Sequence, residues 1–269
     1  MEIPHETVGG FEIPALGLGT WKLKGDRCES TVREALELGY RHIDTAAMYD
    51  NEEAVGRGIE KVPREDLFLT TKVWRNSLSY KDFKDSTYRS LEKLDTDYLD
   101  LLLVHWPNSS VPLEETARAM DELADEEVVR HLGVSNFTAD LLSEIGIISD
   151  HPIRVNQVEF HIGVDQIDIL NYAREEGKVI TAYAPLGKGQ VIDYPKVRGV
   201  AEKYHRSPAQ IALRWVVQQE NVIAIPKASS SAHLEENMKV FEWSLEKADM
   251  ERLSAVQTGR QFDPSWAPW

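Results

Sequence analysis

The chain of 269 residues contains a single cysteine, Cys28, and no long apolar segment. One cysteine cannot form an internal disulfide, and such scarcity is typical of proteins from a reducing compartment. The absence of any run of about 18 apolar residues argues against a membrane-spanning helix. Residues 1–5 do not show the charged and then apolar pattern of a secretory leader. We therefore expect a cytoplasmic protein that has no membrane partner.

Basic residues are also few, because 30 lysines and arginines stand against 45 aspartates and glutamates, a formal net charge of −15. A surface of this sign repels nucleic acids and anionic membranes, so we expect neither as a partner. The acids gather on predicted outer helices, for example in residues 121–127. Solvated helix faces explain most of this excess. The alternative is a halophilic protein, in which a strongly negative surface prevents association at high salt.

Strand-like and helix-like segments alternate along the whole chain. Apolar runs predict eight strands, near 16–21, 42–46, 67–73, 98–106, 131–136, 154–160, 178–184 and 222–227. Helix patterns follow them, among them 26–38, 51–60, 79–94, 114–124, 138–148, 166–176 and 207–218. Near-continuous apolar runs such as 99–104 favour a buried parallel sheet. The sequence thus predicts a (β/α)8 TIM barrel that occupies residues 1–269 as a single domain.

Three segments lie outside this minimal pattern. Gly9-Gly10, between short extended pieces, predicts a β-hairpin at residues 7–14. Residues 194–205 and 245–256 have helix patterns beyond the eight strand–helix units, so we expect two additional helices. The tail, residues 258–269, has too much proline for a helix and too many aromatic residues for a free terminus. We expect it to fold over the open face of the barrel.

Ionisable side chains stand at the carboxyl ends of three successive predicted strands. Asp44 lies near the end of the second strand and Tyr49 follows it, just before the cap-type residues 50–53 that open a helix. Lys72 ends the third strand, and His105 ends the fourth. Taken singly, each has an ordinary structural explanation, as a cap, a core aromatic, a solvated strand tip or a hydrogen-bonded histidine. In a parallel barrel, however, these strand ends converge on the face that carries active sites.

Two motifs at these positions resemble the aldo-keto reductase family, and the resemblance runs along nearly the whole chain. They are GYRHIDTA at 39–46 and LVHWP at 103–107. In length and in its sequence motifs, the chain is most similar to the diketogluconate-reductase-like prokaryotic branch. The resemblance implies NAD(P)H-dependent reduction of small aldehydes, dicarbonyls or ketones to alcohols by hydride transfer. It also implies that the hairpin closes the bottom of the barrel.

Carried over to this sequence, the family's catalytic residues would be Asp44, Tyr49, Lys72 and His105. Tyr49 would act as the general acid that protonates the oxygen of the reduced carbonyl. Lys72, held in place by Asp44, would lower the pKa of the Tyr49 phenol, which is about 10 when unperturbed. His105 would hydrogen-bond the same oxygen and orient the substrate.

The resemblance also implies a nicotinamide cofactor, although the chain lacks the usual G-x-G-x-x-G fingerprint in its proper context. Thr20, Trp21 and Asp44 would border the nicotinamide; Ser135, Asn136 and Gln157 would hydrogen-bond its carboxamide; and Tyr183 would stack on its ring. The loop 184–190, with Pro185, Leu186 and Gly187, would cover the pyrophosphate. In the segment 225–237, Lys227, Ser229, Ser230 and His233 would meet the 2′-phosphate, and Glu236 and Asn237 the adenine. Ala228 and His233 replace the family's common serine and arginine, so a permanently charged bidentate phosphate clamp is missing. NADPH is the expected cofactor, and NADH is the alternative.

The substrate pocket should be aromatic and narrow. Its expected walls are Trp21, Met48, Trp74, His105 and Trp106. Such a pocket favours small carbonyl compounds as substrates. For the oligomeric state, we expect a monomer. Metal-assisted barrel chemistry is a weaker alternative, because the strand-end residues do not form an obvious metal-ligand set. The second alternative is a non-catalytic barrel that binds a nicotinamide nucleotide in a regulatory or structural role, since fold does not fix function.

Overall fold

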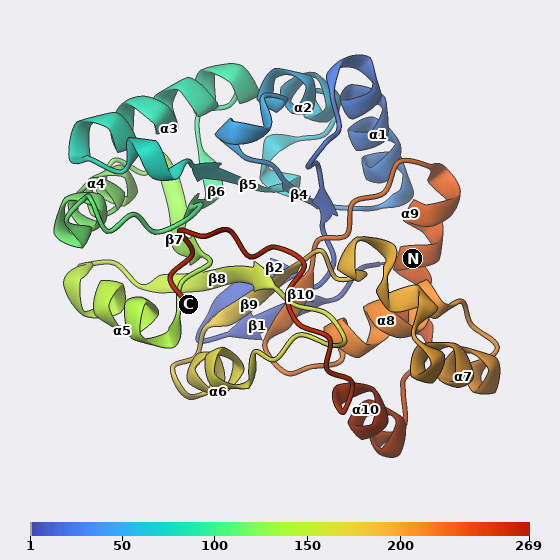
Figure 1. Ribbon diagram of the computed structural model, residues 1–269. Helices are drawn as coiled ribbons and strands as arrows, with labels where there is room; N and C mark the ends of the chain where they lie inside the picture. The colour runs from blue at the N-terminus through green and yellow to red at the C-terminus, as the bar shows by residue number, and fades with distance from the viewer. Residues whose placement is uncertain (1) are drawn as a thin grey trace.

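A barrel of eight parallel strands forms the centre of the protein, as the computed structural model of residues 2–269 shows (Figure 1). The strands are β3 (Leu18–Gly19), β4 (His42–Asp44), β5 (Phe68–Val73), β6 (Leu99–Val104), β7 (Val129–Ser135), β8 (Ile153–Glu159), β9 (Val179–Tyr183) and β10 (Val222–Ala224). They are hydrogen-bonded in chain order from β3 to β10. A parallel bridge between Leu16 and Ala224 joins the last strand to the first. The predicted (β/α)8 barrel is confirmed.

Helices surround the barrel and cover its outer face (Figure 1). They are α1 (Gly25–Leu38), α2 (Glu52–Ile59), α3 (Tyr80–Leu94), α4 (Leu113–Asp125), α5 (Ala139–Ile148), α6 (Ile167–Glu175), α8 (Pro208–Val217) and α9 (Ser231–Met238). Each buries an apolar stripe; in α1 this stripe includes Val32, Ala35 and Leu36. The two additional helices are also present, as α7 (Pro195–Tyr204) and α10 (Lys247–Ser254).

The N-terminal hairpin closes one end of the barrel, as expected. Strands β1 (His5–Val8) and β2 (Phe11–Pro14) pair antiparallel. Phe11 and Ile13 are buried in a cluster that includes Leu101, Leu103 and Ile223 from the barrel strands. A second, larger apolar core lies between the strands and the helices. Strand β6 is buried along its whole length because it contributes to both cores.

The strand register brings the candidate residues to one end of the barrel. Asp44 is paired with Thr70 and Lys72 with Leu103 in the parallel ladder, and His105 directly follows β6. The chain then turns sharply after β4, because Ala47–Tyr49 form a short 3₁₀ turn. Three neighbouring strands therefore deliver their last residues to the same face, opposite the hairpin.

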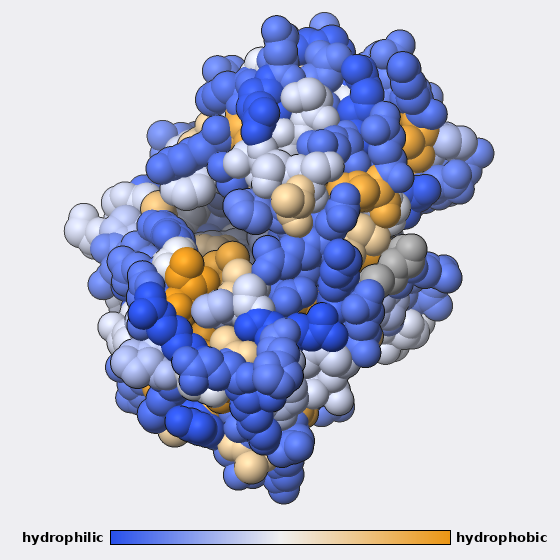
Figure 2. All heavy atoms as spheres, turned by 90° about the vertical axis from the view of Figure 1, so that its right-hand side faces the viewer, coloured by the Kyte–Doolittle hydropathy of each residue, from blue (hydrophilic) through white to orange (hydrophobic). Residues whose placement is uncertain are grey.

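The outer surface is strongly polar. The face drawn in Figure 2 is covered mainly by hydrophilic residues, with hydrophobic residues in small separate groups. Across residues 2–269, every helix is too short or too polar to cross a lipid bilayer.

Candidate active site

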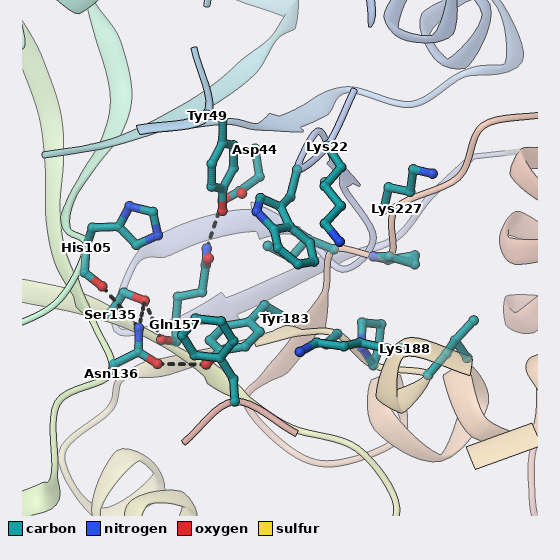
Figure 3. A pocket seen from close by; sticks show the side chains of 18 of the residues that line it. Lys22, Asp44, Tyr49, His105, Ser135, Asn136, Gln157, Tyr183, Lys188 and Lys227 are labelled. Carbon is teal, nitrogen blue, oxygen red and sulfur yellow. Dashed lines mark hydrogen bonds between the residues drawn. The ribbon is translucent and has the colours of Figure 1, made fainter. Parts of the chain in front are cut away.

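A cavity of about 500 Å³ opens at the carboxyl ends of the barrel strands (Figure 3). Thirteen of the predicted site residues line it: Trp21, Asp44, Met48, Tyr49, His105, Trp106, Ser135, Asn136, Gln157, Tyr183, Pro185, Leu186 and Lys227. Eight further lining residues were not singled out as site residues: Gly19, Lys22, Ala184, Lys188, Gly189, Ile225, Pro226 and Phe262. Five of them, from Ala184 to Gly189 and at 225–226, belong to the two segments assigned to the cofactor. The structure thus gathers most of the predicted residues around one space.

A buried ion pair lies beneath this cavity. Nζ of Lys72 donates to Oδ1 of Asp44 over 2.6 Å and to the carbonyl of Thr45 over 2.7 Å. The second carboxylate oxygen of Asp44 accepts from Nε2 of Gln157 at 2.7 Å. The backbone carbonyl of Asp44 accepts from the hydroxyl of Thr20, at 3.0 Å. These bonds hold both charged groups in single positions, because a buried charge needs partners on every side.

Tyr49 and His105 are placed differently, because they have no such partners. Among residues 2–269, neither the Tyr49 hydroxyl nor the imidazole of His105 makes a hydrogen bond, and Nδ1 of His105 is buried without one. The two rings meet edge to face with centroids 5.6 Å apart. Nζ of Lys72 lies 5.0 Å from the centre of the Tyr49 ring. The two groups predicted to contact the substrate oxygen are thus the ones left free to do so.

Burial dominates the protonation behaviour of this group. It raises the pKa of Tyr49 well above its ordinary value, and the Asp44 carboxylate raises it further. It lowers the pKa of His105 well below its ordinary value, with the Lys72 charge acting in the same direction. Lys72 thus does not bring the pKa of Tyr49 below its ordinary value in this geometry, because the loss of solvation dominates. In this geometry Tyr49 is a phenol and His105 a neutral imidazole at neutral pH.

A hydrogen-bonded row of polar side chains forms one wall of the cavity (Figure 3). Ser135 donates to the carbonyl of Gln157 at 2.8 Å. Asn136 donates to the carbonyl of His105 and to Oγ of Ser135, and it accepts from the hydroxyl of Tyr183 at 2.9 Å. Both hydrogens of the Asn136 amide are thereby used. Acceptor positions remain on Asn136 Oδ1 and Gln157 Oε1, which suits the NH₂ group of a carboxamide.

Three lysines gather at the other side of the cavity, away from Tyr49 and His105 (Figure 3). They are Lys22, Lys188 and Lys227, and none lies within ion-pair distance of a carboxylate in residues 2–269. Lys188 belongs to the turn that begins at Gly187 (φ +54°), where a Cβ atom would come within 2.8 Å of the Val191 side chain. Three unpaired cations beside an acceptor-rich wall fit a ligand that has phosphates at one end and an amide at the other.

The predicted adenosine-phosphate segment runs from Lys227, in the cavity wall, through Ser229 and Ser230 into α9. Ser230 caps α9, its hydroxyl accepting from the backbone N–H of His233. His233 itself is exposed. The carbonyl of Ser229 accepts a hydrogen bond from the guanidinium of Arg27 on α1. Arg27 was not predicted, and it brings a permanent positive charge to the segment in which the expected arginine is missing.

Not every predicted cofactor residue is free in this geometry. The Glu236 carboxylate accepts a hydrogen bond from Ser207, the N-cap residue of α8. Asn237 is buried on α9 and Thr20 is buried beneath the cavity. Their roles in binding a cofactor stay predictions.

The tail folds over the open face of the barrel, as expected (Figure 1). Trp266 meets Trp106 edge to face at 4.8 Å and Trp74 at 6.2 Å. Trp74 in turn packs edge to face on His105, with ring centroids 5.0 Å apart. The tail also contributes Phe262 to the cavity wall, 5.7 Å from Trp106. The tail thus adds an aromatic residue to the cavity wall, whereas Trp74, predicted as a wall, packs on His105 and is not among the lining residues.

The family model of the aldo/keto reductase family matches residues 15–258. The chain belongs to the aldo/keto reductase family. A glyoxal reductase of Bacillus subtilis (strain 168) is 39% identical over 261 residues, which cover 95% of this chain and 93% of that protein. The predicted oxidoreductase class is confirmed.

Solved structures of aldo/keto reductases share both the fold and the extent of the chain. A crystal structure titled as a candidate 2,5-diketo-D-gluconic acid reductase B is 40% identical, with a TM-score of 0.95, covering 98% of this chain and 95% of that one. An aldo-keto reductase of Bombyx mori in complex with NADP is 30% identical, with a TM-score of 0.87, covering 94% and 92%. The similarity to the diketogluconate-reductase-like branch is thus confirmed.

No group of three His, Cys, Asp or Glu side chains within the described residues could hold a metal ion. The residues that do line the cavity of this aldo/keto reductase have the donors, acceptors and charges that a nicotinamide dinucleotide requires. Lys22 and Arg27 are additions that the motifs did not indicate, because they lie outside the segments that resemble the family, whereas Lys188 lies in the loop 184–190 that resembles the family's pyrophosphate loop.

Proposed function

We propose that this aldo/keto reductase reduces small aldehydes, dicarbonyls and short ketones to alcohols with NADPH, and that Tyr49 donates the proton. One observation carries the proposal. The hydroxyl of Tyr49 and the ring of His105 border the cavity without hydrogen-bond partners among residues 2–269, while the neighbouring charges of Lys72 and Asp44 are held by hydrogen bonds of their own. An incoming carbonyl oxygen would satisfy both groups at once. The Bacillus subtilis relative is named for glyoxal, a small dicarbonyl.

Bound NADPH supplies the hydride, and the protein supplies orientation and a proton. In our proposal, Gln157 and Asn136 receive the carboxamide, and Tyr183 lies against the nicotinamide ring. The lysines at the opposite side of the cavity neutralise the phosphates. This arrangement fixes the distance between the reacting carbon and the tyrosine, which is where proximity contributes most to the rate.

When the carbonyl carbon accepts hydride, its oxygen acquires negative charge. The Tyr49 hydroxyl donates its proton to that oxygen, and His105 donates a hydrogen bond to it from a neutral ring. The Lys72 ammonium, 5.0 Å from the Tyr49 ring, stabilises the phenolate that remains. Asp44 keeps Lys72 in that place. Because burial raises the pKa of Tyr49, the resting enzyme holds the proton that reduction consumes.

The proposal is tested by the loss of NADPH absorbance with glyoxal, methylglyoxal and a panel of larger aldehydes and ketones. We expect turnover with the small dicarbonyls, and a Tyr49→Phe variant that binds NADPH but does not turn over. Tight NADPH binding without oxidation by any carbonyl in the panel would instead support the non-catalytic barrel. No specific contact in the structure favours that second function.

We further propose that the enzyme is a cytoplasmic monomer that folds as a single domain and has no nucleic-acid partner. The continuous barrel and the excess of 45 acidic over 30 basic residues support this. Light scattering after size-exclusion chromatography should give a mass near 30.6 kDa. A mass twice as large would overturn the monomer, and retention on heparin at low salt would overturn the absence of a nucleic-acid partner.

A further inference from the structure

A buried carboxylate next to the active site holds the tail of the chain. Glu159 ends strand β8, two residues after Gln157, and its side chain has no solvent exposure. One of its oxygens accepts from the backbone N–H of Gln261 at 2.7 Å and the other from that of Phe262 at 3.0 Å. Nε2 of His161, also fully buried, lies 3.0 Å from the first oxygen. Three nitrogen partners account for a charge that would otherwise be costly to bury.

The neighbouring contacts continue this attachment along the chain. Nε2 of Gln166 donates to the Glu159 carbonyl at 2.9 Å, and the amide oxygen of Gln166 accepts from Arg260 at 3.2 Å. Further back, the carbonyl of Gly163 accepts from the N–H groups of Thr258 and residue 259. The segment that follows β8 thus forms a continuous seat for residues 258–262.

The seat determines where the aromatic side chain of Phe262 lies. Phe262 lines the cavity, with its ring 5.7 Å from that of Trp106. On its other side, Nζ of Lys188 lies 5.1 Å from the Phe262 ring and donates to the carbonyl of Gln261 at 3.1 Å. Tail residues 260–262 contain no helix or strand that could set this position. The Glu159 carboxylate provides the only buried charge that receives their backbone N–H groups in the described part of the chain.

We propose that Glu159 is a positioning residue that holds Phe262 against the substrate cavity and so limits the size of the carbonyl compound that is accepted. The effect on substrate size rests on the proposed function, whereas the attachment of the tail to Glu159 is independent of it. Glu159 contacts neither of the groups assigned to the substrate oxygen. It acts through the backbone of the tail, two strand positions from the residue that bonds Asp44.

Glu159→Gln is the variant that tests the attachment. A neutral amide of the same shape has one acceptor oxygen, and its NH₂ group would face a backbone N–H. Asp121→Asn is the matched control, because Asp121 is another buried carboxylate that accepts two backbone N–H groups, from Asp150 at 3.0 Å and His151 at 3.1 Å. It lies on α4, outside the cavity wall.

Amide hydrogen exchange of the full-length protein without cofactor gives the first readout. In wild type, the Gln261 and Phe262 amides should be protected, and Glu159→Gln should speed their exchange roughly tenfold or more. Asp121→Asn should leave both unchanged. Unprotected Gln261 and Phe262 amides in the wild type would overturn the attachment even if the variant fails to fold. Exchange of these amides at the wild-type rate in folded Glu159→Gln would also overturn it.

Steady-state kinetics give the second readout, through the division between KM and kcat. Glu159→Gln and Phe262→Ala should both raise KM for glyoxal, by roughly fivefold, while kcat changes less than about twofold, because a wall is lost rather than the proton donor. Both should improve the relative use of bulky aromatic aldehydes. A fall in kcat with unchanged KM would overturn the positioning role. If the amides exchange as expected but the enzyme reduces no carbonyl compound, the proposed function and the role in substrate selection would both be wrong. The attachment of the tail to Glu159 would still be supported.

Discussion

Nζ of Lys72 lies 2.6 Å from Oδ1 of Asp44, and neither side chain is exposed by more than 2%. Such a pair contributes little to stability by itself, since removing two ions from water costs about as much as their attraction returns. Its value here is positional. The pair, together with the Thr45 carbonyl, leaves the ammonium 5.0 Å from the Tyr49 ring.

Lys72→Met should destabilise the protein by roughly 3–5 kcal/mol, because it leaves the Asp44 carboxylate buried without its ion partner. The double variant Lys72→Met/Asp44→Asn should regain much of that loss in urea unfolding, since no unpaired charge remains. Activity should stay low in both variants, because each lacks the ammonium. Recovery of turnover in the double variant would show that Lys72 serves only the fold.

Tyr49→Phe should lower kcat by roughly 10²–10⁴-fold, the usual contribution of a general acid, with little change in the Kd of NADPH. The hydroxyl removed has no hydrogen-bond partner within residues 2–269, so the melting temperature should also change little. Single-turnover rates and cofactor titration separate the two effects. More than about a tenth of the wild-type kcat would be incompatible with Tyr49 as the proton donor.

The reduction rate should be nearly independent of pH from about pH 6 to about pH 9, as measured by kcat/KM for the carbonyl substrate. A raised Tyr49 pKa keeps the phenol protonated as pH rises, and a lowered His105 pKa keeps the imidazole neutral as pH falls. Alcohol oxidation needs the phenolate and should increase with pH. A loss of reduction centred near neutral pH would mean that Lys72 lowers the Tyr49 pKa after all.

Periodicity and strand-end chemistry were sufficient to predict the barrel and the core of the site. Apart from Asp100, the run 99–104 is apolar on both faces because β6 borders the barrel interior and the helix layer, and this can be read from the sequence. Asp44, Lys72 and His105 were predictable as neighbours because parallel strands in consecutive order bring their ends together. Both rules apply to the sequence without any knowledge of side-chain packing.

Contacts between distant segments could not be predicted in the same way. Asn51 is of a residue type that commonly caps helices. Its side-chain amide instead donates to the carbonyls of Thr20 and Leu23, and it makes no capping hydrogen bond to α2. Tertiary partners 28 and 31 residues away outcompete the local cap. The Arg27 contact with Ser229 spans 202 residues and has no local signal at all. The shift of the Tyr49 pKa likewise depends on burial that only the folded chain defines.

High salt should raise the melting temperature, because screening relieves repulsion within a chain of net charge −15. Salt also weakens attractive surface pairs, such as Lys84 with Glu122 and Glu126 at 2.6 and 2.9 Å, but exposed pairs contribute little. A melting series from low salt to molar KCl measures the balance. Replacing the exposed acids Glu37, Glu202 and Glu235 by glutamine should reduce the response. A flat or falling midpoint in wild type would contradict the halophilic interpretation.

Arg27→Gln should weaken NADPH binding by roughly tenfold while changing the Kd of NADH little, since the guanidinium lies beside the segment predicted to meet the 2′-phosphate and a charge-assisted bond contributes roughly 1.5–3 kcal/mol. His233→Arg should have the opposite effect, because it adds a permanently charged fork at an exposed position of α9. Arg89→Gln, at an exposed position on α3 outside the cavity wall, is the control. Fluorescence titrations with both cofactors give the ratio of Kd values for each variant. An unchanged ratio in Arg27→Gln would leave discrimination to Lys227 and the serines, and an unchanged ratio in His233→Arg would place position 233 out of reach of the phosphate.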